Sequence, residues 1–173
     1  MKTKTIIEIL KGVLFCELYN LFLLSIIIVN YIHNDTYIFE GSSEYTGTPE
    51  KMDISINEWI LTLPYWALKE EIQFRLLPMM IWLFIVFCLR IKYSVCELYV
   101  YRITLGIGIV TSIWFGYVHG NYLNIFIQGV PGFIFFMVFY NVYRIEKSMI
   151  KATLASTINH LITNLLVVLY NYY

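Results

Sequence analysis

The sequence predicts an all-α, polytopic membrane protein: a helix bundle of about five transmembrane helices plus one short, partly buried helix. Hydrophobic residues make up 59% of the 173 residues, charged residues make up only 14%, and the mean hydropathy is +0.67. Soluble domains are about 45–50% apolar and about 25% charged, and one of this size could not bury so much apolar surface in one core. Five spans of about 20 residues would occupy roughly 100 residues. The composition therefore excludes a soluble enzyme, a disordered chain and a disulfide scaffold.

The N-terminal part of the chain predicts an anchor followed by a loop. The first apolar segment covers residues 13–32 and has no small-residue cleavage site after it, which predicts an uncleaved N-terminal anchor span. Residues 33–58 are polar and contain several Gly, Ser and Pro residues, so we expect an exposed loop there. The loop is acidic, with Asp35, Glu40, Glu44, Glu50, Asp53 and Glu58.

The rest of the chain is a motif-bearing core of about 59–173, within a single integral-membrane domain, 1–173. Residues 59–68 predict the short, partly buried helix, which runs into the second span. The expected spans two to five are residues 74–89, 99–119, 122–143 and 153–170, approximately. Glycine and proline at 129–132 permit a kink in the fourth span. We interpret the Phe and Met side chains of 133–139 as lipid-facing.

Charge predicts the orientation and excludes one class of partner. Lysine plus arginine and aspartate plus glutamate both number 12, so the chain has no basic field for nucleic acid. With the N-terminus inside, the following basic residues fall on one side: Lys2, Lys4, Lys11, Arg90, Lys92, Arg102, Arg144, Lys147 and Lys151. The positive-inside rule therefore predicts a multi-pass protein of the cell membrane with its N-terminus inside and its C-terminus outside.

Ionisable side chains within membrane spans are costly and point to functional sites. Three groups of polar residues interrupt the apolar core: Glu70-Glu71 with Arg75, Phe115 with His119, and His160 with Asn164. Each group alone has a structural explanation. Glu71 and Arg75 can form a helix salt bridge, His119 can be an interfacial residue, and His160 with Asn164 can hydrogen-bond between helices.

Together the three groups favour a catalytic site, because side chains from three spans can converge only inside the bundle. A carboxylate beside a neutral imidazole can take a proton from water. A second imidazole and a carboxamide can donate hydrogen bonds to a developing oxyanion. This set is sufficient for attack of water on an amide.

In this order, the groups resemble the motifs of the CAAX-protease and bacteriocin-processing (CPBP) family of intramembrane endopeptidases. The family pattern is Glu-Glu-x-x-x-Arg, Phe-x-x-x-His and His-x-x-x-Asn, each on its own helix, and the resemblance covers about residues 69–164. It implies that Glu70 activates the attacking water with help from His119, and that His160 and Asn164 bind the oxyanion. It also implies supporting roles, with Glu71 and Arg75 holding the local helix in shape and Phe115 as part of the second motif.

The resemblance leaves the need for a metal open, since the family has been described both as metal-dependent and as a glutamate-type protease. Glu70, His119 and His160 could coordinate zinc, because catalytic zinc commonly has three protein ligands and one water. The His-Glu-x-x-His spacing typical of zinc proteases is absent from the sequence. We therefore favour a metal-free mechanism. The predicted spans place Glu70 and His119 near the outer ends of their helices and His160 nearer mid-membrane.

Three hypotheses for function follow. The first is an intramembrane endopeptidase that cuts a small membrane-associated peptide or protein. Small size and abundant Ile, Tyr and Asn would suit a bacterial plasma-membrane protein, for which the resemblance implies bacteriocin or peptide maturation, or self-immunity. The second is a non-catalytic immunity or peptide-binding membrane protein, in which the motif residues are structural. The third is a small transporter, which predicts broken helices and an inverted repeat that the sequence does not clearly contain.

Overall fold

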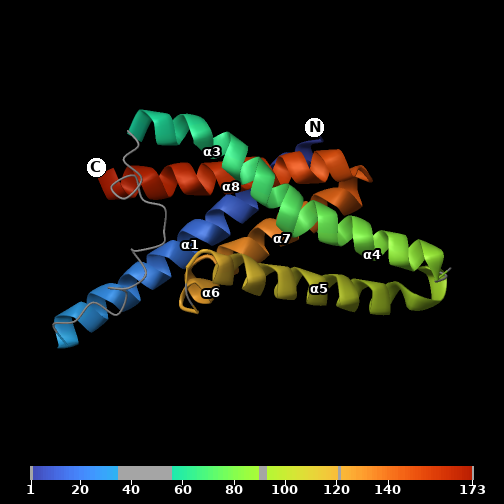
Figure 1. Ribbon diagram of the computed structural model, residues 1–173, viewed down its shortest axis with the longest axis horizontal. Helices are drawn as coiled ribbons and strands as arrows, with labels where there is room; N and C mark the ends of the chain where they lie inside the picture. Colours follow the sequence, from blue (N-terminus) through green and yellow to red (C-terminus); the bar gives the residue numbers. More distant parts are fainter. Residues whose placement is uncertain (1, 35–55, 90–92, 121, 173) are drawn as a thin grey trace.

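The structure is a computed structural model that describes residues 2–34, 56–89, 93–120 and 122–172, and all regular structure in these ranges is helical (Figure 1). The elements are α1 (Thr3–Asn34), α3 (Ile56–Glu71), the π-helical turn η1 (Ile72–Leu76), α4 (Leu77–Cys88), α5 (Tyr93–Val118), α6 (Asn124–Ile127), α7 (Gly129–Glu146) and α8 (Met149–Tyr172). Most of the predicted acidic loop lies outside the described residues.

Five helical stretches in the described ranges are long and apolar enough to cross a membrane, which confirms the predicted polytopic helix bundle. They are Thr3–Ile26, Ile60–Cys88, Val100–Val118, Asn124–Glu146 and Met149–Leu169. The predicted short helix at 59–68 lies within α3 and, as expected, runs into the second span. It belongs to the second stretch, which therefore begins at Ile60 rather than near residue 74.

The second stretch stays continuous although it contains two prolines, and Figure 1 shows α3 and α4 as one long helix crossing the bundle. Proline lacks a backbone N–H and crowds the preceding turn. Immediately before Pro78, the helix widens into η1, in which Leu77 donates its N–H to the carbonyl of Ile72. The π-helical turn inserts an extra residue into the turn, a feature frequent at functional sites. It rotates the residues of η1 relative to those of α3.

Helix α7 is the centre of the bundle, because it packs against α8, α5 and α1. Phe135, Phe136 and Phe139 are buried, so the prediction that the side chains of 133–139 face lipid is wrong for these three. An apolar sequence cannot distinguish a helix surrounded by lipid from one surrounded by other helices, since both environments are apolar. Close approach of α5 to α7 depends on glycine. A Cβ added at Gly108 would lie 2.3 Å from the Phe136 ring.

The N-terminus and the α7–α8 corner are joined by a polar cluster at one end of the bundle. The Glu146 carboxylate accepts hydrogen bonds from the Lys2 backbone N–H at 3.0 Å and the Thr5 hydroxyl at 2.7 Å. It also pairs with Lys151 Nζ at 3.0 Å. We call Lys2, Thr5, Glu146 and Lys151 the basic corner. The α5–α6 turn and the C-terminus lie toward the opposite end (Figure 1).

Candidate functional site

Three helical segments bring the predicted polar residues together. Glu70 and Glu71 are the last residues of α3, Arg75 lies in η1, His119 follows the end of α5, and His160 lies within α8. The segments α3 and η1 pack against α8, and η1 also packs against α5. The long helix therefore presents its acidic residues to both histidine-bearing segments.

Glu71 and Arg75 form a buried ion pair at the base of this cluster. Their side chains are 0% and 1% exposed, and Arg75 Nη1 lies 3.5 Å from Glu71 Oε1. Arg75 Nη2 also donates to the Gly132 carbonyl at 3.0 Å, and its guanidinium lies 4.5 Å from the centre of the Phe115 ring. Buried charges are tolerated when they are paired and hydrogen-bonded in this way.

Two side chains of α8 complete the environment of Glu71. His160 Nδ1 lies 3.1 Å from Glu71 Oε1. The Ser156 hydroxyl hydrogen-bonds to Glu71 Oε2 and lies 2.9 Å from the Phe135 carbonyl oxygen. Both Glu71 oxygens are thus occupied by protein groups. We call Glu71, Arg75, Ser156 and the Gly132 carbonyl the anchor network.

Glu70 has a different environment, although it is the neighbouring residue. Its side chain is 22% exposed. Oε1 lies 3.5 Å from His119 Nε2 and Oε2 lies 3.5 Å from His160 Nε2. These distances allow electrostatic interaction but exceed the usual 2.7–3.2 Å of a direct hydrogen bond. We call Glu70 with the Nε2 atoms of His119 and His160 the Glu70 face.

The partners of the two Nδ1 atoms determine where the imidazole protons lie. His119 Nδ1 is 2.6 Å from the Phe115 carbonyl oxygen, which can only accept a hydrogen bond. His160 Nδ1 faces the Glu71 carboxylate, which is also an acceptor when ionised. Both Nδ1 atoms therefore carry the proton. When the imidazoles are neutral, both Nε2 lone pairs point toward Glu70, so the Glu70 face is a set of three bases.

His119 lies just beyond the apolar stretch that ends at Val118, and its pKa is raised above the ordinary imidazole value. Burial lowers the pKa, but Glu70 and the Phe115 carbonyl raise it by more, since both stabilise the imidazolium form. The surroundings of His119 therefore favour its protonated form.

The donor geometry of the Glu70 face does not fit a zinc site. The chemistry of the residues is suitable, since two Nε2 atoms and one carboxylate converge and each Nδ1 is fixed by an acceptor. Across the described ranges, however, no group of three His, Cys, Asp or Glu side chains is arranged so that it could hold a metal ion.

Contacts within the structure join six of the seven predicted residues to one another, and Asn164 is the seventh. Phe115 is fully buried, with its ring 4.4 Å from that of His119 and 5.9 Å from that of His160. Asn164 is half-buried one helical turn after His160, and within the described part of the chain no hydrogen bond joins it to the cluster. Glu70 lies deeper than predicted. It is ten residues inside the stretch that begins at Ile60, about 15 Å along a helix.

Sequence reasoning missed several groups that contact the predicted residues, among them Ser156, the Gly132 carbonyl and the Phe135 ring. Ser156 is four residues before His160 and shares its helix face, so the spacing from Ser156 to Asn164 was an available signal. The Gly132 carbonyl and the Phe135 ring, which stacks on His160 at 4.4 Å, come from α7. Their positions depend on how α7 packs, and no spacing pattern in the sequence indicates this.

Comparison of the chain with family models, with curated proteins and with solved structures found no match.

Proposed function

We propose that the chain is an intramembrane endopeptidase that hydrolyses a peptide bond of a small membrane-associated peptide. One observation carries the proposal. The Glu70 carboxylate lies between two imidazole Nε2 atoms, each at 3.5 Å, within an apolar span. Intramembrane carboxylates are rare because they are costly, and those that face one another in the bundle interior mark functional sites. The matching of three ordered motifs supports the same function.

In the proposed reaction, Glu70 takes a proton from water and the resulting hydroxide attacks the carbonyl carbon of the substrate. The carbonyl electron pair moves to the oxygen, which becomes an oxyanion. The protonated form of His160 donates its Nε2–H to that oxyanion, and the Glu71 carboxylate stabilises the imidazolium. Asn164 supplies a second donor to the substrate. Glu70 then returns its proton to the amide nitrogen as the C–N bond breaks, and His119 modulates this transfer. General acid–base catalysis of this kind contributes about 10²–10⁴-fold.

We further propose a bacterial plasma membrane as the location, with the N-terminus and the basic corner inside. The substrate would then be a peptide whose maturation, or whose inactivation for self-immunity, requires cleavage in the membrane. Labelling of Ser148→Cys by a membrane-impermeant thiol reagent tests the orientation. Reaction from outside the intact cell would contradict it, whereas Ser42→Cys should react from that side.

The test of the function is a peptidome comparison in the native host, at matched membrane abundance, of wild type, Glu70→Gln and a deletion. Glu70→Gln keeps the shape and removes the base, so one processed peptide should disappear in both Glu70→Gln and the deletion. Glu8→Gln is the matched control, since Glu8 is also a partly buried carboxylate but interacts with Lys11 and Asn141 instead. It should retain the peptide.

A peptidome of Glu70→Gln that matches wild type, with a phenotype in the deletion alone, would contradict catalysis. That outcome would favour the non-catalytic immunity or peptide-binding protein. Loss of the peptide in Glu8→Gln as well would mean that the readout responds to general damage to the bundle.

A further inference from the structure

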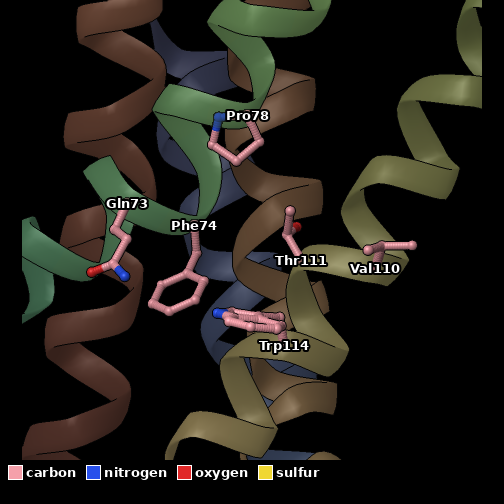
Figure 2. Close-up of a pocket in the computed structure, with 6 residues that line it drawn as sticks. All are labelled: Gln73, Phe74, Pro78, Val110, Thr111 and Trp114. Atoms are coloured by element: carbon pink, nitrogen blue, oxygen red, sulfur yellow. The ribbon is translucent and has the colours of Figure 1, made fainter.

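A cavity of about 280 Å³ lies between the same two helical segments that carry Glu70 and His119. It is lined by Gln73, Phe74, Pro78, Val110, Thr111 and Trp114. The first three come from η1 and α4 and the last three from α5, and Figure 2 shows Phe74 and Trp114 between these helices. Gln73 follows Glu70 by three residues and Trp114 precedes His119 by five. The cavity therefore begins about one helical turn from the Glu70 face.

One layer of aromatic rings separates the cavity from the candidate site. Phe74 is buried, and its ring meets that of Phe115 edge-to-face at 5.3 Å. The Phe115 ring is in turn 4.4 Å from that of His119. On the outer side, Val110 and Trp114 are 66% and 59% exposed, so the cavity opens laterally toward the bilayer.

The cavity contains one polar side chain, Gln73, to which the described part of the chain offers no hydrogen bond. This side chain is exposed. Pro78 has no N–H, so it cannot donate a hydrogen bond to a backbone carbonyl of the preceding turn. Unpaired polar groups facing hydrocarbon are costly, because neither lipid tails nor water can satisfy them there.

The Gln73 carboxamide distinguishes between the possible occupants. A lipid acyl chain would fill the apolar volume but offers no partner to the carboxamide. A peptide in extended conformation offers both a backbone N–H and a C=O, together with an apolar side chain for the cavity. The volume is just below the range of about 300–1,000 Å³ typical of sites for whole ligands, which suits one or two side chains.

We propose that this cavity is the subsite for a large apolar side chain next to the scissile bond of a membrane-embedded peptide substrate, with Gln73 hydrogen-bonding the substrate backbone. This inference rests on the proposed endopeptidase function and names a substrate feature that the function alone does not specify.

The experiment is the peptidome comparison extended to variants of the cavity. Val110→Trp fills the cavity, and Ile109→Trp is the matched control, since Ile109 is an exposed neighbour on α5 that does not line it. The processed peptides that disappear in Glu70→Gln should carry a large apolar residue at one position next to the cleavage site. In Val110→Trp those peptides should fall about 10-fold or more, with small residues preferred at that position. Ile109→Trp should match wild type.

Two further variants keep the proposal testable if Val110→Trp does not reach the membrane. Trp114→Ala widens the cavity and should allow larger residues at the same position. Gln73→Leu keeps the size but removes the carboxamide, and should lower all Glu70-dependent peptides by roughly 2- to 10-fold, the effect of one hydrogen bond, without changing the preferred residue.

Failure of this inference and failure of the function give different results. If Glu70→Gln abolishes the peptides while Val110→Trp and Trp114→Ala leave the preferred residue unchanged, the subsite is overturned and the endopeptidase stands. The same holds if Val110→Trp changes only the lipids that copurify. If Glu70→Gln leaves the peptidome unchanged, the function is overturned and the subsite with it.

Discussion

Glu70 and Glu71 are consecutive in the sequence, yet their environments differ in both burial and partners. Glu71 is fully buried, and both of its oxygens have partners in Arg75, Ser156 and His160. Glu70 is partly exposed, and its oxygens lie 3.5 Å from the Nε2 atoms of His119 and His160. A carboxylate with all partners in place has little left to offer a substrate. The anchor network therefore stabilises the fold, whereas the Glu70 face leaves a carboxylate accessible to a substrate.

The largest expected difference between the two glutamates is in stability. Glu71→Ala leaves the Arg75 guanidinium buried without its carboxylate, and loss of one partner of a buried ion pair typically costs about 3–5 kcal/mol. Glu70→Ala removes a partly exposed group and should cost much less. Thermal or denaturant unfolding in detergent, with the membrane abundance of each variant, measures the difference. Equal losses for the two variants would remove the distinction between the anchor network and the Glu70 face.

A smaller loss of stability is expected for Ser156→Ala, which tests whether Ser156 belongs to the anchor network. The serine hydroxyl has a single proton and lies between two acceptors, Glu71 Oε2 and the Phe135 carbonyl. Its removal should lower the free energy of unfolding by about 1–3 kcal/mol, because it leaves a buried charged acceptor with one partner fewer. Ser25→Ala is the control and should have little effect, because Ser25 is exposed on α1 and its hydroxyl donates to the Phe22 carbonyl of the same helix. An unchanged unfolding midpoint in Ser156→Ala would exclude the serine from the network.

The smallest expected effect is the pH dependence contributed by His119. Since its pKa is raised in the folded protein, this histidine stabilises the fold fully below the ordinary imidazole pKa of about 6.5. That stabilisation is lost as the pH rises through the higher, folded-state pKa. Unfolding of wild type and His119→Gln, compared from about pH 5.5 to 9, should therefore differ most at the acidic end. A difference that grows toward alkaline pH would contradict the proposed pairing with Glu70.

The parts of the site that follow from local spacing could be predicted from the sequence. Glu71 and Arg75, four residues apart, form the expected ion pair, and the apolar run lengths give five spans. The burial of Phe135 and the role of the Gly132 carbonyl as an acceptor could not be predicted. They depend on which face of each helix packs against its neighbours. In a chain this apolar, the packed and lipid-facing sides of a helix have similar composition, so the sequence does not distinguish them. The π-helical turn before Pro78 also has no distinctive sequence pattern.

Because the helix that carries Glu70 is longer than the hydrocarbon layer is thick, the thickness of the bilayer affects how far this helix tilts. The stretch Ile60–Cys88 contains 29 residues, about 44 Å of helix, whereas the hydrocarbon layer is about 30 Å thick. Such an excess is accommodated by tilting, by kinking or by locally thickening the lipid. In a thinner membrane the helix would tilt further, and this tilt would change the distances from the Glu70 carboxylate to the two imidazoles. The acyl-chain length of the surrounding lipid would thus change the geometry of the Glu70 face without any ligand binding to the site.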